Sequence, residues 1–172
     1  MYQTLRRIIR IGIRTEAPPA PAADDVVVAR LQHDILRTLG RALAIRHVDA
    51  GSCNACELEA QALSNPYYNI EGLGIKYVAS PRHADALMVT GPVTKHMAIA
   101  LRRTYDAMPA PKLVIAVGAC ASGTGIYGDN YAVVGTVAKL LPVDVAIPGC
   151  PPSPTALLQG ILAAIRAPQP PR

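Results

Sequence analysis

The stretch Gly51-Ser52-Cys53-Asn54-Ala55-Cys56-Glu57 holds two of the four cysteines in this 172-residue chain. The other two stand alone, in Gly118-Ala119-Cys120 and in Pro148-Gly149-Cys150-Pro151-Pro152. Each of the three segments directly follows a short apolar run that is typical of a β-strand. We therefore expect the three segments to occupy equivalent positions in one sheet.

Five such runs alternate with helical patterns, which indicates an open, doubly wound, mostly parallel α/β sheet. The predicted strands are 44–49, 75–79, 87–90, 113–117 and 143–147, and the predicted helices are 24–43, 57–63, 94–107, 133–140 and 154–166, with a glycine-rich loop over 118–128. In sheets of this kind the functional crevice lies beyond the carboxyl ends of the strands. The cysteines follow the first, fourth and fifth strands, so all four are expected at that edge.

The composition limits the class of protein. Hydrophobic residues make up 51% of the chain and there is no Trp or Phe, so the core must be aliphatic. The formal charge of +5 is modest and gives no reason to expect a nucleic-acid partner. Four cysteines are too few for a disulfide scaffold, which indicates a reducing compartment and thiols that are free to bind metal. No run approaches the roughly 20 apolar residues of a spanning helix, so membrane association is expected to be peripheral.

Proline-rich stretches suggest three parts. Residues 1–43 read as a basic amphipathic segment, a proline-rich linker and a helix, and residues 167–172 as a proline-rich tail. Residues 44–166 form the predicted α/β domain. The basic segment is either a frayed terminus or an element that lies on a membrane surface or on a partner subunit.

Four convergent thiolates suit either zinc or an iron–sulfur cluster. Structural zinc sites usually use two close CxxC pairs, whereas this chain has one close pair. Sixty-three residues separate Cys56 from Cys120, and 29 separate Cys120 from Cys150. Single ligands on separate loops favour a wider object such as a 4Fe–4S cube. Zinc, buried unliganded thiols and a redox dithiol formed by the CxxC pair remain open on spacing alone.

Glycines accompany each of the three cysteine segments. Gly51, Gly118 and Gly149 would let backbone amides approach inorganic sulfur closely, and hydrogen bonds of this kind raise the reduction potential of a cluster. The alternative is that they are ordinary loop glycines.

Several motifs resemble those of one family. They are Cys53-Asn54-Ala55-Cys56-Glu57, residues 80–85 (SPRHAD), residues 90–94 (TGPVT), Gly118-Ala119-Cys120 and residues 142–152 (PVDVAIPGCPP). This set is similar to the small iron–sulfur subunit (20 kDa, B-type) shared by respiratory complex I and membrane-bound, group 4-type NiFe hydrogenases of the formate hydrogenlyase and CO-induced types. The resemblance covers about residues 46–166.

The resemblance implies a flavodoxin-like fold and one 4Fe–4S cluster held by Cys53, Cys56, Cys120 and Cys150. It implies electron transfer at an interface with a catalytic large subunit, so the chain would be an oxidoreductase subunit that is not catalytic alone. Complex I proteins typically have adjacent cysteines in the first ligand pair, whereas this chain has CxxC. We therefore expect the hydrogenase branch, with the B-type subunit of an NADH:quinone oxidoreductase, which delivers electrons to quinone, as the alternative.

The resemblance also implies partners and a location. The partners are a large subunit of the NiFe hydrogenase type or the complex I D type, a ferredoxin-like iron–sulfur subunit and integral membrane subunits. The complex would lie on the cytoplasmic side of the cell membrane.

Other residues near the motifs are weaker candidates. Glu57 and Glu59 either face the large subunit and relay protons or are ordinary first-turn helix charges. Arg82 and His83 are expected near the cluster and the large subunit, or else in a solvated loop. His47 reads as an ordinary histidine. Remote alternatives for the whole chain are a flavin-binding module, although residues 51–54 lack the sequence of a phosphate loop, and a zinc-binding module.

Overall fold

The computed structural model describes residues 40–123, 125–128 and 130–166, together with Arg6, Ile9, Arg10, His33, Ile35 and Arg37. The predicted linker and tail, and most of the predicted N-terminal segment, lie outside the described residues. The helix predicted over 24–43 is helical at the three described positions 33, 35 and 37. Its predicted end at Leu43 is wrong, because Leu43 begins the first strand.

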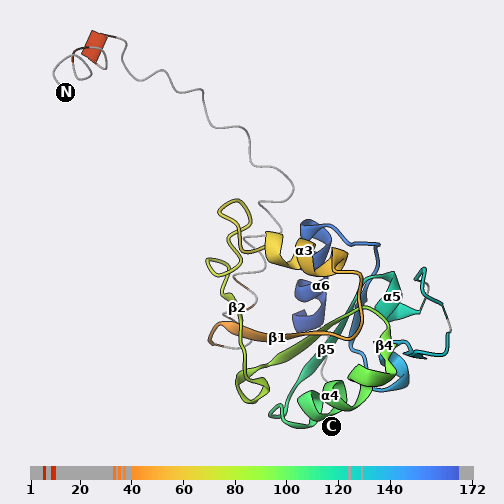
Figure 1. The fold of residues 1–172 in the computed structure, drawn as a ribbon. Helices are drawn as coiled ribbons and strands as arrows, with labels where there is room; N and C mark the ends of the chain where they lie inside the picture. The colour runs from red at the N-terminus through yellow and green to blue at the C-terminus, as the bar shows by residue number, and fades with distance from the viewer. Residues whose placement is uncertain are drawn as a thin grey trace.

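A five-stranded parallel sheet forms the centre of the molecule (Figure 1). Its strands, in the spatial order β2-β1-β3-β5-β7, are β1 (Leu43–Asp49), β2 (Ile75–Tyr77), β3 (Ala86–Thr90), β5 (Leu113–Val117) and β7 (Val145–Ile147). Every neighbouring pair is parallel. This is the flavodoxin-like strand order, so the predicted fold class is confirmed. The direction in which successive strands are added reverses between β1 and β3.

Helices cover both faces of the sheet (Figure 1). Helices α3 (Ala55–Ala62) and α6 (Pro154–Arg166) pack on one face, and α4 (Lys95–Asp106) packs on the other. The short helix α5 (Ala119–Ser122) follows β5 directly. All five residues of β3 and of β5 are buried, as expected for central strands of a parallel sheet with both faces covered. Among the described residues, no helix is long and apolar enough to cross a membrane.

A second, two-stranded sheet corrects the sequence prediction. The helix predicted over residues 133–140 is wrong, because these residues form strand β6 (Val133–Gly135) and the 3₁₀ helix η2 (Val137–Lys139). Strand β6 pairs antiparallel with β4 (Val93–Thr94). Two consecutive valines favour a strand, and Gly135 has a φ of 129°, which a continuing helix does not accept. The pairing partner β4 is too short to be recognised from sequence.

The amino ends of β1 and β3 are joined through one carboxylate. Asp85 accepts a hydrogen bond from the N–H of Ala44 at 3.0 Å and forms a two-pronged ion pair with Arg41. Arg41 is 62% exposed, whereas Asp85 is 13% exposed. The ion pair is therefore screened by water, and the bond to the Ala44 N–H is the more valuable interaction.

We predict that Asp85→Ala destabilises the chain by about 1–3 kcal/mol, because it leaves the Ala44 N–H without an acceptor. Arg41→Ala should cost less than about 1 kcal/mol, since it removes only an exposed ion pair. Urea unfolding of the full chain measures both, with Asp85→Asn as the control that keeps an acceptor oxygen. Equal losses in Asp85→Ala and Arg41→Ala would contradict this ranking.

Candidate metal centre

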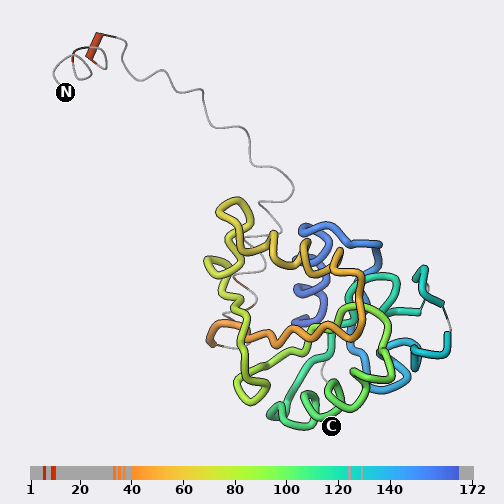
Figure 2. Tube along the Cα trace, in the orientation of Figure 1, coloured from red at the N-terminus to blue at the C-terminus, as the bar shows by residue number. Residues whose placement is uncertain are grey.

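The loops after β1, β5 and β7 lie together at the carboxyl edge of the sheet (Figure 2). The N–H of Gly118 donates to the carbonyl of Ile147 at 2.8 Å, and the N–H of Ala119 donates to the carbonyl of Gly149 at 2.7 Å. These two bonds fix the loop of Cys120 against the loop of Cys150. The CxxC segment begins beside the same edge, since the N–H of Ala50 donates to the carbonyl of Thr90 at 2.9 Å.

The Cys56 side chain reaches from α3 onto the loop after β5. A methyl group placed on Gly118 would lie 2.7 Å from the sulfur of Cys56 and 3.4 Å from the carbonyl oxygen of Gly149. Gly118 has a φ of 87°, a conformation that glycine adopts readily. Its lack of a side chain also leaves room for the sulfur of Cys56. Glycine at this position therefore allows three loops to approach one another around a sulfur atom.

The four thiols influence one another electrostatically. Burial, and then the charges of Glu57 and of the other three cysteines, raises the pKa of Cys56 to about 11. Burial also raises the pKa of Cys120, with Cys150 and Cys53 contributing in the same direction. Thiolates close to one another repel, so the metal-free chain favours the neutral form of Cys56 and of Cys120. A bound cation reverses this preference, because a thiol that coordinates metal loses its proton.

The loop after α5 supplies donors to one sulfur. The backbone N–H groups of Ile126 and Tyr127 hydrogen-bond Cys120 and lower its pKa, although burial outweighs them. A methyl group on Gly125 would collide with the Cys120 sulfur, so this loop closes tightly over it. Amide donors aimed at a sulfur stabilise negative charge on that sulfur.

The donor set consists of four thiols that are carried on three loops. Within the described part of the chain, no group of three or more His, Cys, Asp and Glu side chains is arranged to hold one metal ion. Four thiols on three loops around a crevice suit a cluster whose separate iron corners each take one thiolate. The thiols and the glycine-lined approach to Cys56 and Cys120 therefore fit a 4Fe–4S group.

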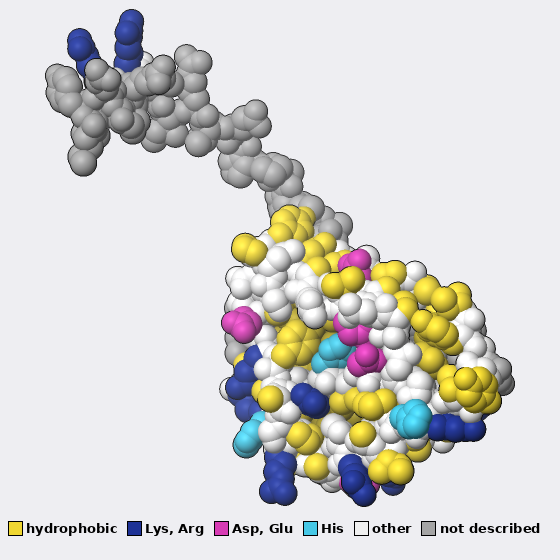
Figure 3. All heavy atoms as spheres, viewed as in Figure 1, with side chains coloured by type: hydrophobic (Ala, Val, Ile, Leu, Met, Phe, Trp, Pro, Cys, Tyr) yellow, Lys and Arg dark blue, Asp and Glu magenta, His cyan; other side chains and the backbone are white. Residues whose placement is uncertain are grey.

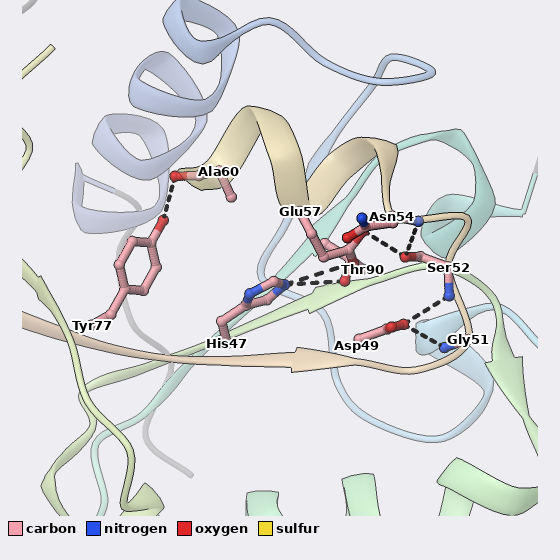
Figure 4. Close-up of polar contacts among 9 residues, drawn as sticks. All are labelled: His47, Asp49, Gly51, Ser52, Asn54, Glu57, Ala60, Tyr77 and Thr90. Atoms are coloured by element: carbon pink, nitrogen blue, oxygen red, sulfur yellow. Dashed lines mark hydrogen bonds and ion pairs between the residues drawn. The ribbon is translucent and has the colours of Figure 1, made fainter. Parts of the chain in front are cut away.

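Glu57 points into the protein and not toward solvent (Figure 4). Its Oε2 accepts a hydrogen bond from the Ser52 hydroxyl at 2.6 Å. Its Oε1 is buried and has no hydrogen-bond partner among the residues that the structure describes. The Nε2 of His47 lies 3.9 Å from Oε1 and 3.1 Å from the hydroxyl of Thr90. Burial lowers the pKa of His47, and Glu57 opposes that shift. Glu57 is thus a helix first-turn charge with a second role, holding Ser52 next to Cys53.

The remaining predicted residues lie in different places. Gly51, with a φ of 128°, packs against Thr94 and shapes the loop without lying beside a thiol. Glu59 is partly buried on α3. Arg82 and His83 are exposed on the 3₁₀ helix η1 (Pro81–His83).

The expected position of Arg82 and His83 near the cluster needs correction. Helix η1 leads into the amino end of β3, where the N–H of Asp85 donates to the carbonyl of Ala44 at 2.8 Å. The cysteines lie at the opposite, carboxyl edge. The cause is the shortness of β2, after which the chain returns at once to the amino end of β3. A role for these two residues in a subunit interface stays a prediction.

Some residues around the thiols were not identified from sequence. His47 and Thr90 form part of the polar group around Glu57, and Gly125 closes the loop over Cys120. Thr90 could have been identified from the sequence, because it is a polar residue at the end of an otherwise apolar strand. Gly125 carries no signal beyond belonging to a glycine-rich loop.

The edge also carries apolar side chains. Cys53 and Cys150 are exposed, and Ile126 and Tyr131 in the loop after α5 are 80% and 90% exposed. In Figure 3, apolar side chains gather on the side of the molecule where Figure 1 shows α5. Large exposed apolar groups beside exposed ligand candidates are typical of a surface that a partner covers.

Comparison with known proteins identifies the family. The family described as NADH ubiquinone oxidoreductase, 20 Kd subunit, matches residues 53–164, which include all four cysteines. The chain belongs to this family. The sequence resemblance to this family is therefore confirmed.

Two relatives show how members of the family are used. The chain is 43% identical over 147 residues to formate hydrogenlyase subunit 7 of Escherichia coli (strain K12), covering 86% of this chain and 58% of that protein. It therefore spans little more than half the length of that relative. It is 42% identical to a probable membrane-bound hydrogenase subunit of Pyrococcus furiosus, covering 76% of this chain and 78% of that protein.

A solved structure has the same fold. It is a chain of the membrane-bound sulfane sulfur reductase (MBS), an archaeal respiratory membrane complex, with a TM-score of 0.65 and 34% identity over 78% of this chain and 73% of that chain. Two of the similar chains are named as subunits, and the third belongs to a membrane complex. This chain accordingly belongs to a family that is described by a subunit of an oxidoreductase.

We predict that NMR titration places the pKa of His47 below its usual value of 6.5, because burial disfavours the imidazolium. Glu57→Gln should lower this pKa further, since it removes the charge that opposes the shift. Glu59→Gln is the control and should leave it unchanged. Because the unfolded chain binds the proton more tightly, stability should rise with pH between the folded-state pKa and 6.5. A higher His47 pKa in Glu57→Gln would refute the arrangement.

Proposed function

We propose that this chain is the electron-transfer small subunit of a membrane-associated, group 4-type NiFe hydrogenase complex. It binds one 4Fe–4S cluster through Cys53, Cys56, Cys120 and Cys150 and passes electrons to or from the catalytic large subunit. The observation that carries the proposal is the convergence of these four thiols at one edge of the sheet. The spacing of the cysteines, the glycine at position 118 and membership of the family support it.

The cluster, when bound, supplies a one-electron carrier. The chain's own residues hold and shield it. The bonds from Gly118 and Ala119 to the β7 loop keep two ligand loops in fixed register. The amides of Ile126 and Tyr127 stabilise negative charge on Cys120. Glu57 holds Ser52, and Ser52 accepts from the N–H of Asn54 at 3.0 Å, so the CxxC loop keeps its shape.

The exposed surface beside the cysteines supports a role in a complex. An electron carrier works only when its donor or acceptor approaches closely, and Cys53 and Cys150 lie at the surface. Ile126, Tyr127 and Tyr131 provide apolar contacts around them. We assign this surface to the large subunit, with a ferredoxin-like subunit and integral membrane subunits as further members on the cytoplasmic side of the cell membrane.

The description of the family favours a second candidate, the B-type subunit of an NADH:quinone oxidoreductase. The CxxC spacing and the likeness to a formate hydrogenlyase subunit and a hydrogenase subunit favour the first. Elemental analysis of the native complex distinguishes them. We expect one nickel per copy of this chain, since the hydrogenase large subunit carries nickel and the quinone-reducing one does not. A nickel-free complex that reduces quinone would establish the second candidate.

We predict that Cys120→Ala or Cys150→Ala abolishes the cluster, because each removes the thiolate from one iron corner. Iron and acid-labile sulfide content and the EPR spectrum of the reduced full chain measure this. The visible spectrum separates iron–sulfur charge transfer from flavin bands and from colourless zinc protein. A full iron and sulfide complement in both variants would overturn the ligand assignment.

We predict that Gly118→Ala also loses the cluster while the sheet still folds. The added methyl collides with Cys56, and the backbone conformation costs about 1–3 kcal/mol in addition. Gly40→Ala is the matched control, since Gly40 also has a positive φ but has no atom within 4 Å of the added methyl. Iron content and circular dichroism of both variants report the result, and equal iron in the two would contradict the close approach of Cys56.

A further inference from the structure

Strand β1 extends beyond its neighbour β2. The two strands pair only between Leu43–Ile45 and Ile75–Tyr77, whereas β1 continues to Asp49. The last hydrogen bond between them runs from the N–H of Val78 to the carbonyl of Ile45, at 2.9 Å. After that bond the chain of β2 turns away, so among the described residues the second half of β1 pairs with a strand on the β3 side only.

Successive residues of a strand direct their backbone groups to opposite sides. The carbonyl of Ala44 accepts a hydrogen bond from the N–H of Asp85, on the β3 side. The N–H of Leu43 donates to the carbonyl of Gly74, on the β2 side, at 2.8 Å. By this alternation the backbone groups of His47 and Asp49 point to the side that β2 has left. Neither backbone N–H nor carbonyl of these two residues has a partner among the residues that the structure describes.

A cavity of about 380 Å³ lies beside this free edge. It is lined by His47 and Arg46 of β1, by Gln61 and Ser64 near the end of α3, and by Tyr77 and Val78 where β2 ends. Figure 4 shows the rings of Tyr77 and His47 beneath α3. The cavity therefore occupies the place into which a longer β2 would continue.

One donor in the lining is unpaired. The Nε–H of Arg46 is buried and has no hydrogen-bond partner among the described residues. No Asp or Glu is among the described residues that line the cavity. The carboxylate of Glu57 lies 3.9 Å from the Nε2 of His47 in the lining. A buried donor without a partner is costly, so we expect the Nε–H of Arg46 to meet a hydrogen-bond acceptor. Because the guanidinium is charged, an anionic acceptor suits it best.

We propose that an extended segment of another subunit adds to β1 in this cavity as a further strand. Its backbone pairs with His47 and Asp49, and an acidic side chain on it meets Arg46. Unpaired backbone groups along a strand are a template for such pairing, and strand addition is an established mode of peptide recognition. The chain's own tail is a poor occupant, because Pro168, Pro170 and Pro171 have no N–H to donate. The proposal rests on the proposed function only in taking this chain to be part of a complex, and it depends on neither the cluster nor the electron acceptor.

Hydrogen exchange of the full chain, alone and in the purified membrane complex, tests the pairing. The amides of His47 and Asp49 should exchange quickly in the isolated chain and be protected in the complex. The amides of Arg46 and Val48, which face β3, should be protected in both. Fast exchange of His47 and Asp49 in the complex overturns the proposal. Protection already present in the isolated chain, and lost when residues 1–32 are deleted, would show that the chain's own N-terminal segment is the occupant and also overturns it.

Two pairs of variants test the contacts. His47→Pro removes the outward N–H, while His47→Ala loses the same imidazole but keeps that N–H. Co-expressed with tagged wild-type chain, His47→Pro should enter the complex about tenfold less than His47→Ala. The Arg46→Gln variant should enter the complex less than the control variant Arg103→Gln, which changes an exposed arginine on α4. Circular dichroism and iron content confirm folding of each variant. Equal incorporation within both pairs refutes the added strand, whatever the cluster content.

Discussion

Parallel pairing of β1, β3, β5 and β7 is the constraint on which the site depends. Strands that run in one direction end at one edge, so the loops that follow β1, β5 and β7 meet there although they are far apart in the sequence. The bond from Ala119 to Gly149 joins two of these loops, and Gly118 admits the sulfur of Cys56 between them. Because the central strands are buried along their whole length, the loops that carry the cysteines stand on a rigid base.

Bringing four thiols together has an electrostatic consequence. Burial and mutual repulsion raise the pKa of Cys56 and Cys120, so the chain alone resists the charged form that a metal requires. A multivalent cationic centre relieves this repulsion, and the free energy of binding is then coupled to the release of protons. The amides of Ile126 and Tyr127 act in the same sense, because they stabilise the thiolate without carrying a charge that must be paired.

The sequence predicts most of this fold because its strongest signals are local. Uninterrupted apolar runs such as 113–117 indicate buried parallel strands, and the position of each cysteine after such a run places it at the carboxyl edge. The failures have non-local causes. Residues 133–135 form a strand only because the two-residue β4 pairs with them. The inward orientation of the Glu57 side chain depends on its contacts with Ser52 and His47. The separation of Arg82 from the thiols depends on where β2 ends.

The relatives share the sheet and differ in what their names say they act on. A formate hydrogenlyase subunit, a hydrogenase subunit and a chain of a sulfane sulfur reductase each match more than three quarters of this chain. A scaffold common to different reactions cannot itself choose the reaction, since function is set by sites placed on a fold. The choice must then be made where this chain meets its neighbours. Two surfaces of the described chain are suited to such contacts: the apolar loop around Ile126 beside the thiols, and the free edge of β1 at His47. The first lies beside the thiols. The second reaches to the carboxyl end of α3, so a partner held there need not touch the thiols.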